Sequence, residues 1–269
     1  MAVTNYFNFG YSEWLTFGAF IDLMVNAQVL RLNIWLAVIF AGVATAALSL
    51  ALNRGVCGPF ANRRRDPFFI LIVTFAIGFL LNQAYIVIWG TEYHELLAPT
   101  TQELSFGTIH ISTDQLAFLV IALACMAGAQ LILSRTRIGK SMRAVADNRR
   151  LAEVCGLQTK RVTDVTWLIT GFMAGVAGVM LALQTHTFGP DMGDNYVYLI
   201  FPAVIIGGIG RAGGAVTGAV LIGVFGALGS LLIPASVSTV LIFVALVAIV
   251  VLRPQGILGS GRRPSMQEG

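Results

Sequence analysis

Long apolar stretches, most of them close to the length of a membrane span, dominate this sequence of 269 residues. They cover about 10–30, 33–52, 68–90, 114–134, 163–185, 196–209, 212–233 and 237–252. A helix needs about 20 apolar residues to cross the ~30 Å hydrocarbon core of a bilayer. Since 57% of the residues are hydrophobic and only 11% are charged, a soluble core cannot hold this much apolar surface. The sequence therefore predicts an all-α, polytopic membrane protein with about eight transmembrane or partly spanning helices.

The connections between these stretches alternate in charge. Connections 53–67 and 135–162 are rich in arginine and lysine, whereas 91–113 and 186–195 have neither and carry acidic residues instead. Lysine and arginine are retained on the cytoplasmic side of membranes. We therefore expect a multi-pass protein of the plasma membrane with both termini in the cytoplasm and three passes after residue 195. Arg31, which this topology places outside, is the one exception.

No linker or low-complexity tract divides the chain, so the sequence predicts a single membrane domain over residues 1–269. Cys57, Cys125 and Cys155 lie far apart and form no C-x-x-C pair, which predicts free thiols and no metal site. The three histidines (His94, His110, His186) fall in or beside the acidic connections, without a catalytic motif. We expect a protein that is not an enzyme and needs no cofactor.

The segment "GGIGRAGGAVTG", residues 207–218, contains a literal G-x-G-x-x-G. A dinucleotide loop needs a soluble βαβ unit and an acidic residue about 20 positions later, yet no Asp or Glu occurs between Gly214 and Gln267. The glycines instead predict close helix packing and a break at Gly207–Gly210 beside a transport path. The sequence leaves these two roles open for the glycine-rich segment 196–233.

The segment "SRTRIGKS", residues 134–141, ends like a nucleotide-binding P-loop but has Ser134 in place of the first glycine. We interpret it as a basic anchor, so any ATP must be bound by another chain. The residues that follow, "GKSMRAVADNRRLAEVCGLQTKRV", predict a short basic amphipathic helix over about 141–155 that Gly156 ends. Such a helix either lies on anionic lipid or docks into a groove of a cytoplasmic partner.

Four segments carry a family resemblance. In order along the chain they are "TRIGKSMRAVADNRRLAEVCGL", "GFMAGVAGVMLA", "FPAVIIGGIGRAGGAVTGAVLIG" and "LRPQGILG". The chain resembles the permease subunits of ABC importers for branched-chain amino acids (LivH/LivM type) from Asn8 to Gly259. Two features depart from that family. The usual leading hydrophobic helix does not precede "NFGYSE", so the true start lies upstream or a helix has been lost, and Tyr11 replaces the family's histidine.

The resemblance implies a transport permease that works with a second homologous permease, two cytoplasmic ATP-binding subunits and an extracytoplasmic solute-binding protein. It makes the inner loop 135–162 a coupling loop and its helix an ATPase docking element. The residues expected there are Met142, Arg143, Val145, Ala146, Leu151, Ala152, Val154 and Gly156. The acidic residues expected to meet the binding protein are Glu92, Glu95, Asp191 and Asp194.

Polar groups at membrane depth usually face a pathway or a partner. On this basis the candidate substrate pathway consists of Asn8, Glu13, Asn82, Gln83, Gln184, Tyr196 and Tyr198, with Gly207, Gly208 and Gly210. Glu13 either holds a substrate ammonium or lies at the inner interface. The expected cargo is an amino acid, with branched-chain amino acids favoured, or a small amide or urea. The alternative function is a secondary transporter or channel that needs no ATPase.

Overall fold

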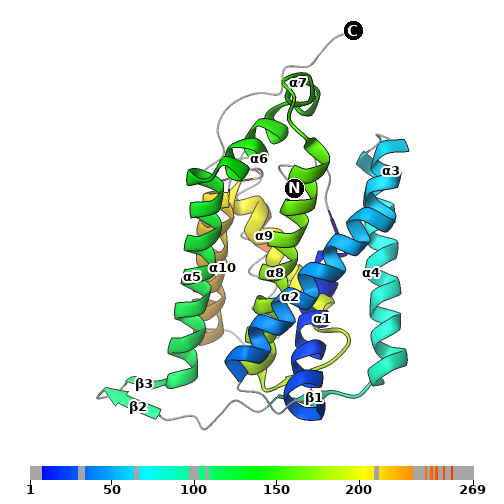
Figure 1. Ribbon diagram of the computed structural model, residues 1–269. Helices are drawn as coiled ribbons and strands as arrows, with labels where there is room; N and C mark the ends of the chain where they lie inside the picture. Colours follow the sequence, from blue (N-terminus) through cyan, green and yellow to red (C-terminus); the bar gives the residue numbers. More distant parts are fainter. Residues whose placement is uncertain are drawn as a thin grey trace. The chain divides into compact units, whose positions relative to one another are not determined.

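The computed structural model describes residues 8–29, 34–63, 67–96, 103–106, 109–208 and 212–232, with a few isolated positions beyond them (Figure 1). Helices make up most of this part of the chain. They are α1 (Tyr11–Leu23), α2 (Ile34–Leu52), α3 (Gly58–Arg63), α4 (Pro67–Trp89), α5 (Thr113–Arg135), α6 (Arg137–Asp147), α7 (Arg149–Val154), α8 (Thr159–Thr185), α9 (Met192–Gly207) and α10 (Ala212–Leu232), with π-helical segments η1 (Met24–Val29) and η2 (Asn53–Cys57). The short strands β1 (His94–Glu95) and β4 (Thr187–Phe188) pair, as do β2 (Glu103–Phe106) and β3 (Ile109–Ser112).

Four of the described helical stretches are long and apolar enough to cross a membrane: Ile34–Phe60, Phe68–Trp89, Thr113–Arg135 and Thr159–Thr185. Shorter apolar helices cover Met192–Gly207 and Gly213–Gly229. The prediction of an all-α polytopic membrane protein is confirmed. The last predicted stretch, 237–252, lies outside the described residues except at isolated positions.

The first predicted stretch, about 10–30, is helical from Tyr11 to Val29, since α1 passes directly into η1. Two other predicted boundaries were wrong. The connection 53–67 begins as helix, because α2 continues through η2 into α3. The helix expected over 141–155 is two helices, since Asn148 adopts an extended backbone between α6 and α7.

The chain divides into two compact units, residues 3–195 and residues 196–269. The core of the first unit is the packing of α1 and α2 on α8. Glycines allow this close approach: a Cβ atom on Gly18 would lie 2.5 Å from the carbonyl oxygen of Gly175, and one on Gly175 would lie 2.6 Å from Thr45 Oγ1. In lipid, small residues of this kind are a main source of helix association.

Polar groups at the contact between α2 and α8 are paired. Ser49 Oγ donates to the Trp167 carbonyl at 2.6 Å and joins α2 to α8. At the end of α2, Asn53 Nδ2 donates to Asp164 Oδ1 at 2.8 Å, while Arg54 forms an ion pair with Asp164 at 2.9 Å. These bonds fix α2 against α8 where both helices leave the apolar region.

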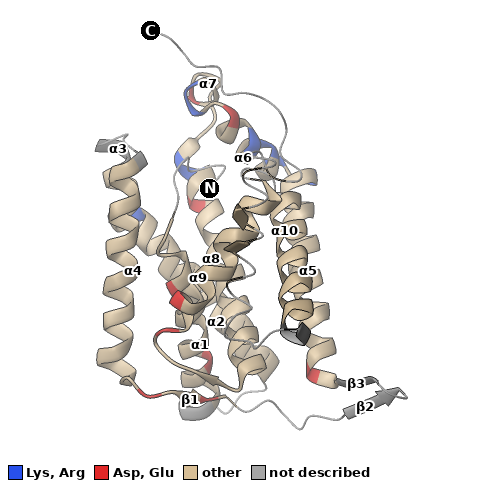
Figure 2. Cartoon of the chain, turned by 180° about the vertical axis from the view of Figure 1, so that it is seen from behind, with Lys and Arg blue, Asp and Glu red and all other residues tan. Residues whose placement is uncertain are grey.

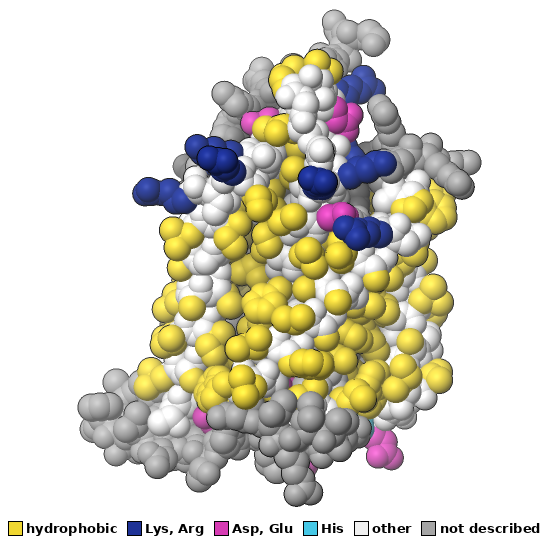
Figure 3. Space-filling model, in the orientation of Figure 1, with side chains coloured by type: hydrophobic (Ala, Val, Ile, Leu, Met, Phe, Trp, Pro, Cys, Tyr) yellow, Lys and Arg dark blue, Asp and Glu magenta, His cyan; other side chains and the backbone are white. Residues whose placement is uncertain are grey.

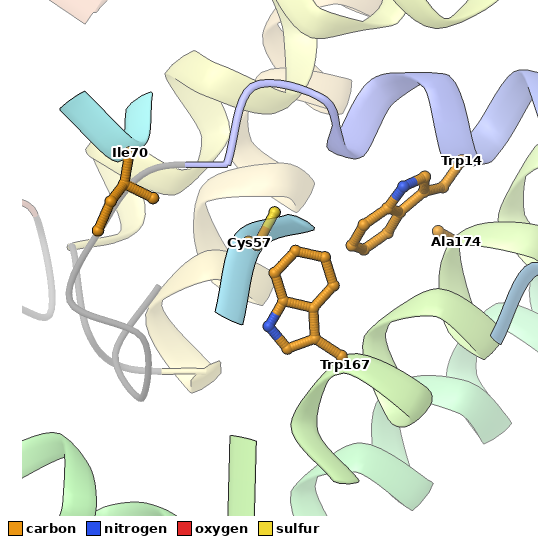
Figure 4. Packing of buried hydrophobic residues seen from close by; sticks show 5 residues of the cluster. All are labelled: Trp14, Cys57, Ile70, Trp167 and Ala174. Carbon is orange, nitrogen blue, oxygen red and sulfur yellow. The ribbon is translucent and has the colours of Figure 1, made fainter. Parts of the chain in front are cut away.

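An aromatic cluster joins four elements of the first unit (Figure 4). The Trp14 ring of α1 meets the Trp167 ring of α8 with centroids 5.2 Å apart, and Cys57, Ile70 and Ala174 complete the cluster. At the other end of α1, the fully buried Phe20 stacks on Trp89 at 4.8 Å and contacts Phe188 edge-on. Because aromatic contacts hold α1 at both ends, this short helix has a defined place.

The basic residues of the first unit lie toward one end of its long axis (Figure 2). Lysine and arginine gather at the end formed by α6, α7 and the start of α8, which we call the basic end. The opposite end carries β1 and β4. Between the two, hydrophobic side chains cover the visible face of α2, α4, α5 and α8 (Figure 3). On α5 no described residue is fully buried, so much of the surface of that helix is exposed in this chain.

Glycines also bring α9 and α10 together within the second unit. Gly207 and Gly214 lie backbone to backbone, and Gly218 packs on the Ala203 carbonyl. Gly208 follows the last turn of α9 with φ +102°, a conformation that favours glycine. The helix-packing role predicted for Gly214 and Gly218 is confirmed. Gly213 has no described atom within 4 Å of its Cβ position, so the described residues give it no such role.

Candidate functional site: a buried carboxyl at the start of a short helix

Two carboxyl side chains of α1 are buried. Asp22 is fully buried, with neither oxygen hydrogen-bonded among the described residues, and Glu13, in the first turn, is only 2% exposed. Its carboxyl group makes hydrogen bonds with the side chains of Asn82, on α4, and Asp194, in the first turn of α9. The Oε2 atom has no hydrogen-bond partner among the described residues. A carboxyl group in such a position is costly and indicates a functional site.

Close backbone packing places the starts of α1 and α9 side by side. Gly193 contacts the Ser12 carbonyl, with no room for a side chain, and its amide donates to Thr16 Oγ1 at 2.8 Å. Asn82 Nδ2 also donates to the Pro190 carbonyl at 2.8 Å. After β4 the chain therefore packs back on α1 and α4, and this places Asp194 beside Glu13.

The structure brings together residues that the sequence assigned to two different surfaces. Asp194, predicted to meet the binding protein, shares a site with Glu13 and Asn82 from the predicted pathway. Asn8 is half-buried just before α1, whereas Gln83 and Gln184 are exposed on α4 and α8. Tyr196, Tyr198, Gly207 and Gly208 belong to the second unit, and Gly210 lies outside the described residues.

Two contributors to the site were not predicted. Tyr85 Oη donates to the Glu13 carbonyl at 3.0 Å, and Thr16 holds the start of α9. Tyr85 was missed because an aromatic residue within an apolar stretch is usually core. Thr16 was missed because a lone threonine in a helix gives no signal in a sequence.

The basic end carries a rigid corner made by α6 and α7. Gly139 packs on the backbone of Ile132 and Leu133 and lets α6 turn sharply away from α5. Thr136 caps α6 and Asn148 caps α7, each side chain accepting a backbone amide at 3.0 Å. Gly156 follows α7 with φ +82° and ends it, as predicted.

Burial divides the predicted docking residues of this corner into two groups. Met142, Val145 and Ala152 are at most 4% exposed and pack with Val162 of α8. Leu151 and Val154 are 60% and 85% exposed, and Arg143 and Gly156 are also exposed, while Ala146 is intermediate. Met142, Val145 and Ala152 therefore hold the corner on α8. Leu151 and Val154 present an exposed apolar surface with basic residues around it.

The end opposite the basic end is a small ordered surface. His94 and Glu95 pair with Phe188 and Thr187 in the two-stranded ladder. Tyr93 Oη donates to Asp191 Oδ2 at 2.8 Å, and this hydrogen bond and the nearby negative charge raise the pKa of Tyr93. Asp191 also accepts from Asn195 at 2.9 Å. Glu92 and Glu95 are exposed, which leaves them open to a partner.

Nothing in the described part of the chain resembles a nucleotide or metal centre. The segment before Gly207 is the helix α9 and not a strand, and "SRTRIGKS" runs from α5 into α6, so neither has the strand that a phosphate-binding loop follows. The described residues contain no group of three or more metal-binding side chains. The described geometry is that of a helical membrane protein with polar groups placed between helices.

The comparisons with known proteins agree with this class. The family model for "Branched-chain amino acid transport system / permease component" matches residues 1–252, and the chain belongs to this family of transport permeases. It is 26% identical to the high-affinity branched-chain amino acid permease BraD of Pseudomonas aeruginosa, over 97% of the chain and 87% of BraD. The corresponding LivH of Escherichia coli (strain K12) shows the same identity and coverage. No solved structure matches.

Proposed function

We propose that this chain is the membrane subunit of an ATP-driven importer for amino acids, with branched-chain amino acids as the favoured cargo. In this proposal an external binding protein delivers the cargo, a second homologous permease completes the path and two cytoplasmic subunits hydrolyse ATP. The two access states of the permease are populated according to the nucleotide state of those subunits. Both termini are cytoplasmic, and residues 1–269 act as one permease domain.

The observation that carries this proposal is the corner formed by α6 and α7. Leu151 and Val154 are exposed apolar side chains on a well-capped structure anchored to α8. A lipid-bound amphipathic helix would lie in the plane of the membrane with its apolar face toward lipid. Here the apolar face of α6 packs on α8, so that face is not free to lie on lipid. This favours docking of a protein partner on the exposed residues Leu151 and Val154.

Other predicted residues have their own roles in this proposal. Arg143 supplies positive charge beside the docking surface, and Gly156 allows the chain to turn back into α8. Glu92 and Glu95 at the opposite end form the surface for the binding protein, and Asp191 shapes it through Tyr93. Glu13, Asn82 and Asp194 line the path.

The family does not by itself define the cargo. A permease protein of the autoinducer 2 import system of Klebsiella pneumoniae, LsrC, is also similar, with 30% identity over 54% of the chain. The names of BraD and LivH support branched-chain amino acids for this chain. A secondary transporter or channel remains the second candidate function, and it predicts no requirement for an ATPase.

Purification of the tagged chain from its native membranes tests the assembly. We expect a second permease and ATP-binding subunits to co-purify in fixed proportion, because the docking corner is preformed. Mass spectrometry of the purified complex identifies these chains. Recovery of a complex that contains only this chain and still catalyses uptake would contradict the importer and favour the secondary transporter.

A further inference from the structure

The site around Glu13 contains two carboxyl groups and one neutral amide. Asn82 donates to the Glu13 carboxyl group, and the Asp194 carboxyl group lies at hydrogen-bonding distance from it. Glu13 is buried, whereas Asp194 is exposed. The unpaired Oε2 atom of Glu13 shows that the protein leaves one hydrogen-bonding position of this carboxyl group unfilled.

No basic side chain balances this pair within the described ranges. The ion pairs found there are Arg54 with Asp164 and Arg149 with Glu153. Both lie near the basic end, where the described lysines and arginines gather (Figure 2). Two adjacent carboxyl groups repel each other unless a proton or a cation lies between them, so this pair can hold either one.

The backbone around the pair holds it in a fixed shape. The Gly193–Thr16 hydrogen bond joins α9 to α1, and the Asn82–Pro190 hydrogen bond joins the segment before α9 to α4. Tyr85 Oη donates to the Glu13 carbonyl. The carboxyl groups therefore face each other without rearrangement, which is what a binding site for a small cation requires.

We propose that Glu13 and Asp194 bind the primary ammonium group of an amino acid as it crosses the membrane, with Asn82 holding Glu13 in position. The ammonium replaces the proton that the two carboxyl groups would otherwise share, and it has three donors, enough to reach both carboxyl groups, including the unpaired Oε2 atom. Urea and neutral amides carry no positive charge. The inference rests on the proposed function and narrows its cargo to molecules with a primary ammonium group.

Thermal stabilisation of the assembled, detergent-solubilised importer tests the site without the binding protein. The probes are leucine, isoamylammonium and its neutral analogue isoamyl alcohol. We expect the first two to stabilise the wild type and the alcohol not to. In Glu13→Gln and Asp194→Asn the apparent affinity for both ammonium probes should fall about tenfold or more, because one of the two carboxylates that bind the ammonium is removed. Glu13→Asp should retain part of the affinity.

The charge-matched control is Asp147→Asn, since Asp147 is exposed on α6; it should leave the affinity unchanged. Equal affinity of wild type and Glu13→Gln, equal stabilisation by the alcohol, or no ammonium-dependent stabilisation of the wild type would each overturn the inference.

A measurement of leucine uptake separates failure of this carboxyl site from failure of the proposed importer. If ATP-dependent leucine uptake is the same in wild type and Glu13→Gln, the carboxyl site is refuted while the importer stands; if wild-type uptake is independent of ATP, the importer itself fails.

Discussion

Replacing Gly18 with alanine should destabilise the protein by about 2 kcal/mol or more, as expected for overpacking a well-packed core. The new Cβ atom would lie 2.5 Å from the Gly175 carbonyl oxygen and 2.6 Å from its Cα atom. Both are backbone atoms of α8, so the contact is relieved only if α1 moves. A lower midpoint of thermal unfolding in detergent would report the loss of stability.

The matched control is Gly128→Ala on α5. No atom lies within 4 Å of the Cβ position there, and alanine favours helix over glycine, so the midpoint should stay the same or rise. Because α1 also carries Glu13, the Gly18 variant should lose transport as well as stability. Equal midpoints for Gly18→Ala and the wild type would show that α1 is not packed on α8 as described.

Replacing Val154 with glutamate should release the ATP-binding subunits from the permease. Val154 is 85% exposed at the end of α7, and a charge placed in the centre of an apolar contact commonly costs about 2 kcal/mol or more in binding. That corresponds to roughly a thirtyfold weaker complex. Leu151→Glu should behave in the same way. Co-purification of the ATP-binding subunits with the tagged chain measures the effect, with the yield of the chain in the membrane as reference.

Two further variants separate docking from folding. Gly55→Glu adds the same charge at the exposed end of η2, where no atom lies within 4 Å of the Cβ position, and should leave co-purification intact. Ala152→Glu, at a position only 4% exposed, should instead lower the yield of the chain itself. Unchanged co-purification in both Val154→Glu and Leu151→Glu would exclude this corner as the docking element.

The membrane architecture was predictable because it depends on quantities that a sequence displays directly. The lengths of the apolar stretches gave α4, α5 and α8 within a few residues. The separation of basic from acidic connections agrees with the two charged ends of the first unit. Gly156 as the end of α7 and the packing of Gly214 and Gly218 also followed from residue type alone.

The missed features depend on contacts between distant parts of the chain. The approach of Asp194 to Glu13 requires the return of the chain after β4, which no local pattern displays. The burial of Met142 and Val145 depends on the sharp turn at Gly139, which presses α6 against α8. The break at Asn148 was missed because asparagine caps α7 inside what reads as one amphipathic helix.

The central claim is that this permease moves its cargo only when a separate ATPase hydrolyses ATP. The direct test is leucine uptake into proteoliposomes that contain the assembled importer, its binding protein outside and ATP inside. One preparation carries intact ATP-binding subunits and the other carries subunits that bind ATP but cannot hydrolyse it. We predict accumulation against a gradient with the intact subunits and none with the hydrolysis-deficient ones. Equal accumulation in both preparations would contradict the account.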